Sequence, residues 1–229
     1  MMRKIALLIF AVLGGLLTMI GCGDNDAVIT GPVGWAIGYR SDNTAAILHT
    51  ANGGKNWEEQ GNPALWTGLS GNDISAVDKW TAWAAVGGGP SSGGAILHTT
   101  DGGATWRMDA PAVSGPNDID DICAPEADMV WAVQNIGGMS GGRIIRVRLV
   151  NGKVISDTMD PMSGKYQYEG VTCFDEKTVW VVGFKAYGVD PGLPEGVILH
   201  TEDGTTWTSQ TLPVSDVSLW KVSFAGAHR

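Results

Sequence analysis

A tryptophan-centred phrase returns along this chain at a nearly constant interval, and this repeat limits the folds available to it. The four copies lie 48, 48 and 49 residues apart, at Trp35, Trp83, Trp131 and Trp180. A second phrase, "ILHT", follows three of the copies, and the third copy has the weaker match "IIRV". Repeats of about 50 residues with several short strands are typical of β-propeller blades. We therefore predict an all-β propeller of four-stranded antiparallel blades, with about four repeats of ~49 residues.

The second repeat shows how one blade is read. We predict strands at 73–77, 81–87, 95–100 and 105–109. A Gly-rich loop separates the second from the third, and an Asp-Gly-Gly turn separates the third from the fourth, which predicts an antiparallel meander. The predicted boundaries along the chain are repeats 31–62, 63–113, 114–160 and 161–214, followed by a terminal inner strand at 215–229.

The number of blades has two interpretations, because the first repeat has no room for a full inner strand. In one, residues 216–225 pair antiparallel with residues 35–38 and close a small four-bladed ring. In the other, the sequence is the N-terminal part of a longer propeller. An unclosed array would leave sheet faces and strand edges exposed, which favours closure slightly.

The turn after each "ILHT" has its own pattern, Ser/Thr-x-Asp-x-Gly-x-Thr-Trp, known as the Asp-box. Aspartate at a turn start accepts backbone hydrogen bonds, and glycine supplies a positive φ. We interpret these residues as turn-formers and not as catalytic acids. The matching positions are Thr99, Asp101, Gly103, Thr105 and Trp106, with Thr50, Asn52, Gly54 and Trp57 in the first copy, and Thr201, Asp203, Gly204, Thr206 and Trp207 in the fourth.

These phrases resemble the photosystem II assembly-factor-like propellers, within the wider group of bacterial neuraminidase (BNR) or Asp-box repeats. The resemblance covers nearly all of residues 31–229. It implies an extracytoplasmic propeller that assists assembly of a membrane complex without enzymatic activity. Asp-box propellers also include sialidases and glycanases, so a carbohydrate-binding or glycan-cleaving protein is the alternative.

The N-terminus carries an export signal. Residues 1–21 combine a basic start with an apolar run, as in a signal peptide, and Gly21 before Cys22 resembles a bacterial lipobox. The resemblance implies cleavage before Cys22 and lipid on its thiol, with residues 22–30 as a short linker. We expect an exported protein anchored to the outer membrane or to the outer face of the plasma membrane.

The charge and the titratable residues narrow the partners. Beyond residue 21 the chain has 13 basic and 24 acidic residues, so nucleic acid is a poor partner. His49, His98 and His200 recur by repeat, so we predict no metal ligands among them, and no catalytic or cofactor residues elsewhere. We interpret the three carboxylates of "NDIDD", at Asp118, Asp120 and Asp121, as a solvated strand entry.

Two further predictions concern cysteines and the binding surface. Cys123 and Cys173 hold matching places in neighbouring repeats, and such places usually lie too far apart for a disulfide, so free buried thiols are favoured. Loops on one rim of the propeller are where binding is expected. The function we predict is a non-enzymatic membrane-anchored scaffold for protein partners, with candidate rim residues Tyr39, Arg40, Tyr187, Asp190 and Glu195.

Overall fold

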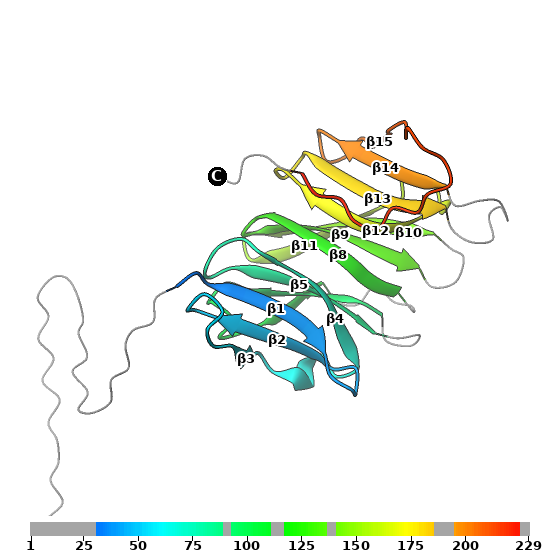
Figure 1. Cartoon of the computed structure of the whole chain (residues 1–229). Coiled ribbons are helices and arrows are strands. Elements are labelled where there is room, and N and C mark those ends of the chain that lie inside the picture. Colours follow the sequence, from blue (N-terminus) through cyan, green and yellow to red (C-terminus); the bar gives the residue numbers. More distant parts are fainter. Residues whose placement is uncertain (1–30, 89–92, 111–116, 137–140, 186–194, 225–229) are drawn as a thin grey trace, which may run out of the picture.

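A computed structural model describes residues 31–88, 93–110, 117–136, 141–185 and 195–224. These residues form antiparallel sheets that follow one another along the chain (Figure 1), which confirms the predicted all-β fold of propeller-type blades. The first sheet has three strands and each of the next three sheets has four.

The strands within each sheet are adjacent in sequence. The first sheet comprises β1 (Gly34–Tyr39), β2 (Ala45–Thr50) and β3 (Glu58–Gln60), followed by the short 3-10 helix η1 (Pro63–Leu65). The second comprises β4 (Leu69–Ala76), β5 (Ala82–Gly88), β6 (Ala95–Thr99) and β7 (Arg107–Ala110). The third comprises β8 (Asn117–Glu126), β9 (Met129–Ile136), β10 (Gly142–Val150) and β11 (Lys153–Met159). The fourth comprises β12 (Tyr166–Cys173), β13 (Val179–Lys185), β14 (Gly196–Thr201) and β15 (Thr208–Ser209).

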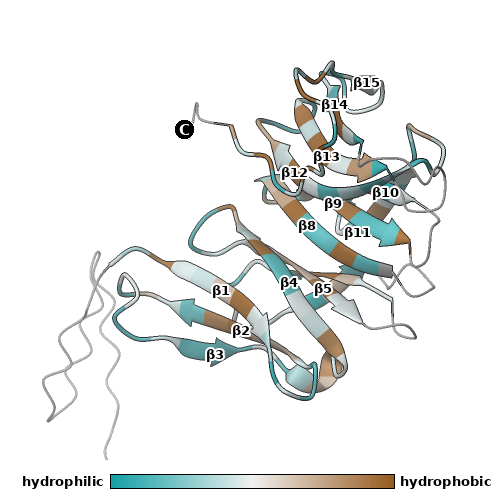
Figure 2. Cartoon of the chain, turned by 45° about the vertical axis from the view of Figure 1, so that its right-hand side comes forward, coloured by the Kyte–Doolittle hydropathy of each residue, from teal (hydrophilic) through white to brown (hydrophobic). Residues whose placement is uncertain are grey.

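The sheets pack face to face, and apolar side chains fill the space between each neighbouring pair. Hydrophobic and hydrophilic residues alternate along strands such as β8 (Figure 2), as expected when side chains point to opposite faces in turn. One core lies between the first and second sheets, with Ile47 and Leu97 fully buried. A second lies around Trp83 and Ile145, and a third around Trp131. Burial is therefore distributed over successive interfaces, as in a stacked-repeat protein.

The repeated tryptophan and histidine are explained by strand pairing. Trp83 lies opposite His98, and their rings stack at 3.8 Å between centroids. Trp180 and His200 stack in the same way at 4.5 Å. In the third sheet Arg146 takes the place of histidine and lies over the Trp131 ring at 5.3 Å. The "ILHT" histidines therefore cover the indole of the adjacent strand, a role that the sequence pattern alone did not reveal.

The Asp-box turns are closed by side-chain hydrogen bonds. In the second sheet the Gly103 amide donates to Thr99 Oγ1 at 2.9 Å, and the Thr105 amide donates to Asp101 Oδ1 at 2.9 Å. The bonds from Thr105 hold the pKa of Asp101 below its usual value. Gly103 has a φ of +85°, and a Cβ there would lie 1.6 Å from Gln60 Oε1, so only glycine fits without displacing that amide.

The other two Asp-box turns keep this arrangement with small changes. The Gly54 amide donates to Thr50 Oγ1 at 3.0 Å, while Asn52 stands in for aspartate and accepts from the Asn56 amide. In the fourth sheet the Gly204 amide donates to Thr201 Oγ1, and hydrogen bonds from Thr206 and Thr205 lower the pKa of Asp203. The third sheet has instead a two-residue hairpin at Asn151 and Gly152, both with positive φ, as in a type I′ turn.

The tryptophans that follow these turns differ in burial. Trp106 is 5% exposed and packs between the first and second sheets. Trp207 contacts Trp131 edge to face at 5.8 Å between ring centroids. Trp57 is 44% exposed, because it follows the turn of the first sheet, which has a neighbour on one face only.

The predicted closure of the ring by strand pairing is wrong. Residues 216–224 lie against the fourth sheet, at the opposite end of the array from β1 (Figure 1). Phe224 stacks on Trp180 at 4.0 Å between ring centroids, and Trp220 lies 5.1 Å from the Phe184 ring. The aromatic face of the fourth sheet therefore holds the terminal segment, and β1 keeps one edge without a strand among the residues described.

Candidate functional site

The first strand of each four-stranded sheet, here called the inner strand, bonds to the next inner strand about 50 residues later. Asp73 Oδ2 accepts from the Ile122 amide at 3.0 Å, and Ser75 Oγ accepts from the Ala124 amide at 3.0 Å. Asp121 Oδ2 accepts from the Val171 amide at 2.8 Å in the same way. The inner strands β4, β8 and β12 therefore form a continuous hydrogen-bonded row.

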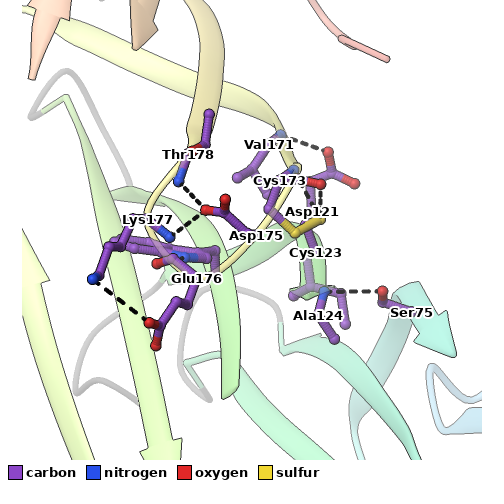
Figure 3. Close-up of a disulfide and its surroundings, with 12 residues drawn as sticks. Ser75, Asp121, Cys123, Ala124, Val171, Cys173, Asp175, Glu176, Lys177 and Thr178 are labelled. Carbon is purple, nitrogen blue, oxygen red and sulfur yellow. Dashed lines mark hydrogen bonds and ion pairs between the residues drawn. A yellow bond between two sulfur atoms is a disulfide. The ribbon is translucent and has the colours of Figure 1, made fainter. Parts of the chain in front are cut away.

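Cys123 and Cys173 form a disulfide across this row, with their Cα atoms 5.9 Å apart, so the prediction of free thiols is wrong (Figure 3). Strand register gives the reason. Cys123 lies opposite Trp131, whereas the residue opposite Trp180 is Thr172 and not Cys173. Neighbouring residues of a strand point to opposite faces, so this offset of one residue turns Cys173 back toward Cys123. Two strictly equivalent cysteines would both point toward the next sheet.

Each inner strand has an irregularity of one residue at the same place. Strand register shifts at Asn72 in β4, at Asp120 in β8 and at Glu169 in β12. Bulges of this kind redirect a side chain and are common beside binding sites. Asn135 joins two of them, because its amide N–H donates to Asp120 Oδ2 at 3.1 Å and its side chain donates to Glu169 Oε1 at 2.9 Å.

These carboxylates have altered acidity. Burial, with the nearby charge of Glu169, raises the pKa of Asp120 to about 7. Burial also raises the pKa of Glu169. The interpretation of "NDIDD" as a solvated entry is wrong for Asp120, whose pKa is raised by burial, and for Asp121, which is 6% exposed and bonded to β12. Asp118 is exposed, but partial burial raises the pKa of its carboxyl as well. Lys221 from the terminal segment also reaches Asp121, with Nζ 2.5 Å from Oδ1.

A pocket of about 420 Å³ lies at the loop-bearing end of the fourth sheet. Tyr166 donates its hydroxyl hydrogen to Glu195 Oε1 at 2.6 Å, and Lys185 Nζ lies 3.3 Å from Glu195 Oε2. Burial and the Glu195 carboxylate raise the pKa of Tyr166 to about 12. The pocket lining mixes these groups with aliphatic ones: Tyr166, Glu195, Gly196, Val197, Ser209, Gln210, Leu212, Val214, Ser215 and Asp216.

The candidate rim residues fall into two described places. Tyr39 is 66% exposed at the end of β1, and Arg40 donates to the Ala45 carbonyl at 2.9 Å and pairs with Glu59. Glu195 lines the pocket of the fourth sheet. Tyr187, Asp190 and the lipidation candidate Cys22 lie outside the described residues. The structure thus brings the predicted rim residue Glu195 together with Lys185 and with Tyr166 of β12, and Tyr166 is the one that the sequence pattern did not single out.

The described residues contain neither a membrane-spanning helix nor a metal-binding cluster. Within the described ranges, no helix is long and apolar enough to cross a bilayer. In the same part of the chain, no cluster of three or more histidine, cysteine, aspartate or glutamate side chains is arranged to hold a metal ion.

Solved structures show what this arrangement resembles, whereas no protein-family model and no curated protein sequence matches the chain. YCF48 from Cyanidioschyzon merolae is 20% identical, with a TM-score of 0.53 over 80% of this chain and 59% of that one. The GH74 xyloglucanase from Xanthomonas campestris is 12% identical, with a TM-score of 0.52 over 78% of this chain and 28% of that one. The chain therefore spans part of these proteins, and the likeness defines a propeller-type fold.

Proposed function

We propose that the protein is a non-enzymatic scaffold that binds protein partners on the loop-bearing rim of its propeller blades. The observation that carries this proposal is the pocket around Tyr166 and Glu195. It offers aliphatic and hydrogen-bonding groups side by side, and Val214 in its lining is 58% exposed. Loops and pockets on a rigid strand scaffold are usual places for recognition.

Tyr166 fixes the position of the carboxylate in this pocket. Its hydroxyl donates to Glu195 Oε1 at 2.6 Å, and burial together with this carboxylate raises the pKa of the phenol to about 12. Tyr166 is therefore neutral at physiological pH and holds Glu195 in place for a partner. A carboxylate in this position is also where a general base for a tyrosine nucleophile would lie, so this contact does not separate the scaffold from the second candidate below.

Photo-crosslinking from two valines would test this proposal. A crosslinking amino acid at Val214 probes the pocket, and one at Val150, which is 42% exposed at the far end of β10, is the matched control. We expect Val214 to capture a discrete envelope protein and Glu195→Ala to abolish that capture, with neither effect from Val150. Equal capture from both positions, or capture unaffected by Glu195→Ala, would contradict the proposal.

Glycan binding or cleavage is the second candidate, because Glu195 and Asp216 line the same pocket as Tyr166. Paired carboxylates flanking a sugar are the usual machinery of glycoside hydrolysis. Hydrolysis of sialylated or β-glucan oligosaccharides that disappears in both Glu195→Gln and Asp216→Asn would favour this candidate. Loss of protein crosslinking with no turnover would favour the scaffold.

We further propose that lipid on Cys22 anchors the protein to the cell envelope. The support is the apolar run that ends at Gly21 and Cys22. Cys22→Ala should release the protein from the membrane fraction or leave an uncleaved precursor. Identical fractionation and identical mass of the two forms would contradict this proposal.

A further inference from the structure

The segments that follow the outer strands of the first and fourth sheets correspond to each other residue by residue. Gln60 of β3 pairs with Ile47, the first residue of "ILHT" in the first sheet. The Gln210 amide donates to the carbonyl of Ile198, which holds the same place in the fourth sheet, at 2.8 Å. From these glutamines the chain runs on as "QGNPALW" and "QTLPVSD", with proline at the same spacing in both. The two segments can therefore be compared position by position.

In the first sheet this segment fills the outer edge of the third strand with an indole. Trp66, the last residue of "QGNPALW", is 2% exposed, and its Nε1 donates to the Ala45 carbonyl at 3.1 Å. Trp106 of the second sheet belongs to the same core. The second sheet thus covers the indole without displacing it, and the occupant of this edge comes from the segment itself.

In the fourth sheet the same place is a pocket. Asp216 stands where the first segment has Trp66, and it lines the pocket of about 420 Å³ described above. Gly196, also in the lining, corresponds to Ala45, because each lies two residues before the isoleucine of "ILHT". A carboxylate has replaced the indole, and the place of its ring system at the edge of β14 is open.

The backbone beside the pocket is oriented as it is beside the indole. The Lys185 amide donates to the Glu195 carbonyl at 2.8 Å. Bonded and non-bonded pairs alternate between antiparallel strands, so the carbonyl of the next residue, Gly196, points away from β13 and toward the outer edge. The Ala45 carbonyl has this orientation in the first sheet, where it accepts from the indole. The acceptor that an indole uses is therefore present in the fourth sheet.

We propose that this pocket binds a tryptophan side chain of the protein partner, an inference that rests on the scaffold function proposed above. The indole N–H donates to the Gly196 carbonyl, and the ring lies against Leu212 and Val214 of the lining. The chemistry matches, because an indole has one donor and no acceptor, whereas Glu195 and Asp216 add only acceptors to an otherwise aliphatic wall. Tryptophan is also among the residues that most often anchor protein interfaces.

Binding of a small indole to the full-length protein tests the recognition directly. Ligand-observed NMR titration measures the affinity for N-acetyl-L-tryptophanamide, for its 1-methyl analogue, which has no indole N–H, and for N-acetyl-L-leucinamide, which has no ring. We expect the methyl analogue to bind about two- to tenfold more weakly, through loss of one hydrogen bond, and the leucine amide to bind at least about tenfold more weakly. Equal affinity for all three compounds, or no binding of the tryptophan amide, would overturn the proposal.

A variant that refills the pocket from its own segment locates the site. Ser215 is exposed in the pocket lining, so Ser215→Trp places an indole beside the position that Trp66 holds in the first segment. We expect this variant to bind N-acetyl-L-tryptophanamide at least about tenfold more weakly than the wild type. Ser156→Trp is the matched control, because Ser156 is exposed on β11 and does not line the pocket. Equal affinity of the two variants would overturn the proposal.

Competition separates this inference from the scaffold function on which it rests. Saturating N-acetyl-L-tryptophanamide should suppress photo-capture of a protein from position 214, and saturating N-acetyl-L-leucinamide should not. Capture that persists with the tryptophan amide bound would overturn the tryptophan site and leave the scaffold standing. Binding of the tryptophan amide without any protein capture would contradict the scaffold and, with it, the partner assigned to this site.

Discussion

The interface between the second and third sheets and the interface between the third and fourth use equivalent inner-strand positions, but they are joined differently. In the first case Ser75 accepts a hydrogen bond from the Ala124 amide. In the second case the same two places are Cys123 and Cys173, and they are covalently linked. The backbone arrangement is shared, since Asp73 and Asp121 make the same bond to the following strand. The pair of side chains at these two places therefore decides whether two blades are linked covalently or by a hydrogen bond.

Aromatic burial should exceed either of these inner-strand links. Trp106 fills the space between the first and second sheets, so Trp106→Ala should lower the free energy of unfolding by about 3–5 kcal/mol through lost burial and a cavity. Denaturant melts measure this loss. Trp57→Ala is the control, because Trp57 is 44% exposed and its loss should be well under half as large. Equal losses would mean that packing between these sheets does not depend on Trp106.

Removal of the disulfide should have the next largest effect. It closes a segment of 50 residues, and such links usually stabilise a protein by about 2–4 kcal/mol. Cys123→Ser with Cys173→Ala should therefore lower the free energy of unfolding by this amount and remove the sensitivity of the melt to dithiothreitol. If the wild-type melt is already insensitive to reductant, the covalent link does not distinguish the two interfaces.

A disulfide can also be introduced between the second and third sheets, at the interface that has a hydrogen bond in its place. Ser75→Cys with Ala124→Cys places cysteines at the positions that Cys123 and Cys173 occupy one sheet later. We expect a second disulfide and a gain of about 2 kcal/mol in oxidising conditions. Mass spectrometry of non-reduced peptides identifies the bond. Ser75→Cys with Ile122→Cys is the control, because position 122 lies beside Asp73, two residues along the strand from position 124. Failure of the first pair to crosslink would show that the two interfaces are not equivalent.

The buried Asp120 of the third sheet should make the stability of the protein depend on pH. The pKa of Asp120 is about 7 in the folded protein and ~3.9 in the unfolded chain, so the folded state retains a proton that the unfolded state has lost. This contribution is complete below about pH 4 and disappears as the pH rises through about 7. Asp120→Asn should flatten the profile in this range by about 1–3 kcal/mol. Melts at several pH values measure the slope, and exposed Asp128→Asn should leave it unchanged.

Local features of this structure were predictable from the sequence, and those that depend on distant geometry were not. The strands around Trp35, Trp83, Trp131 and Trp180 follow from the repeat, and so does the missing inner strand of the first sheet. The disulfide depended on the two cysteines being out of step by one residue: Cys123 lies 8 residues before Trp131, whereas Cys173 lies 7 residues before Trp180. This difference in spacing was the signal in the sequence. The place of residues 216–224 depended on how far the sheets curve, and no local pattern records that. The pocket at Tyr166 and Glu195 joins residues 29 positions apart on different strands, so only the folded chain brings it together.

The row of inner strands also sets an order of events for a chain that enters its compartment with the N-terminus first. The hydrogen bonds between neighbouring inner strands join residues 47 to 50 positions apart, so each sheet can form alone and then dock on the sheet before it. Cys123 would emerge and fold with the third sheet while its partner is still 50 residues away. The chain has three cysteines, so the first thiol available to Cys123 during this interval is Cys22. If Cys22 carries the lipid proposed above, its thiol is capped and that competitor is removed, so the same modification that anchors the chain would also protect the pairing of Cys123 with Cys173.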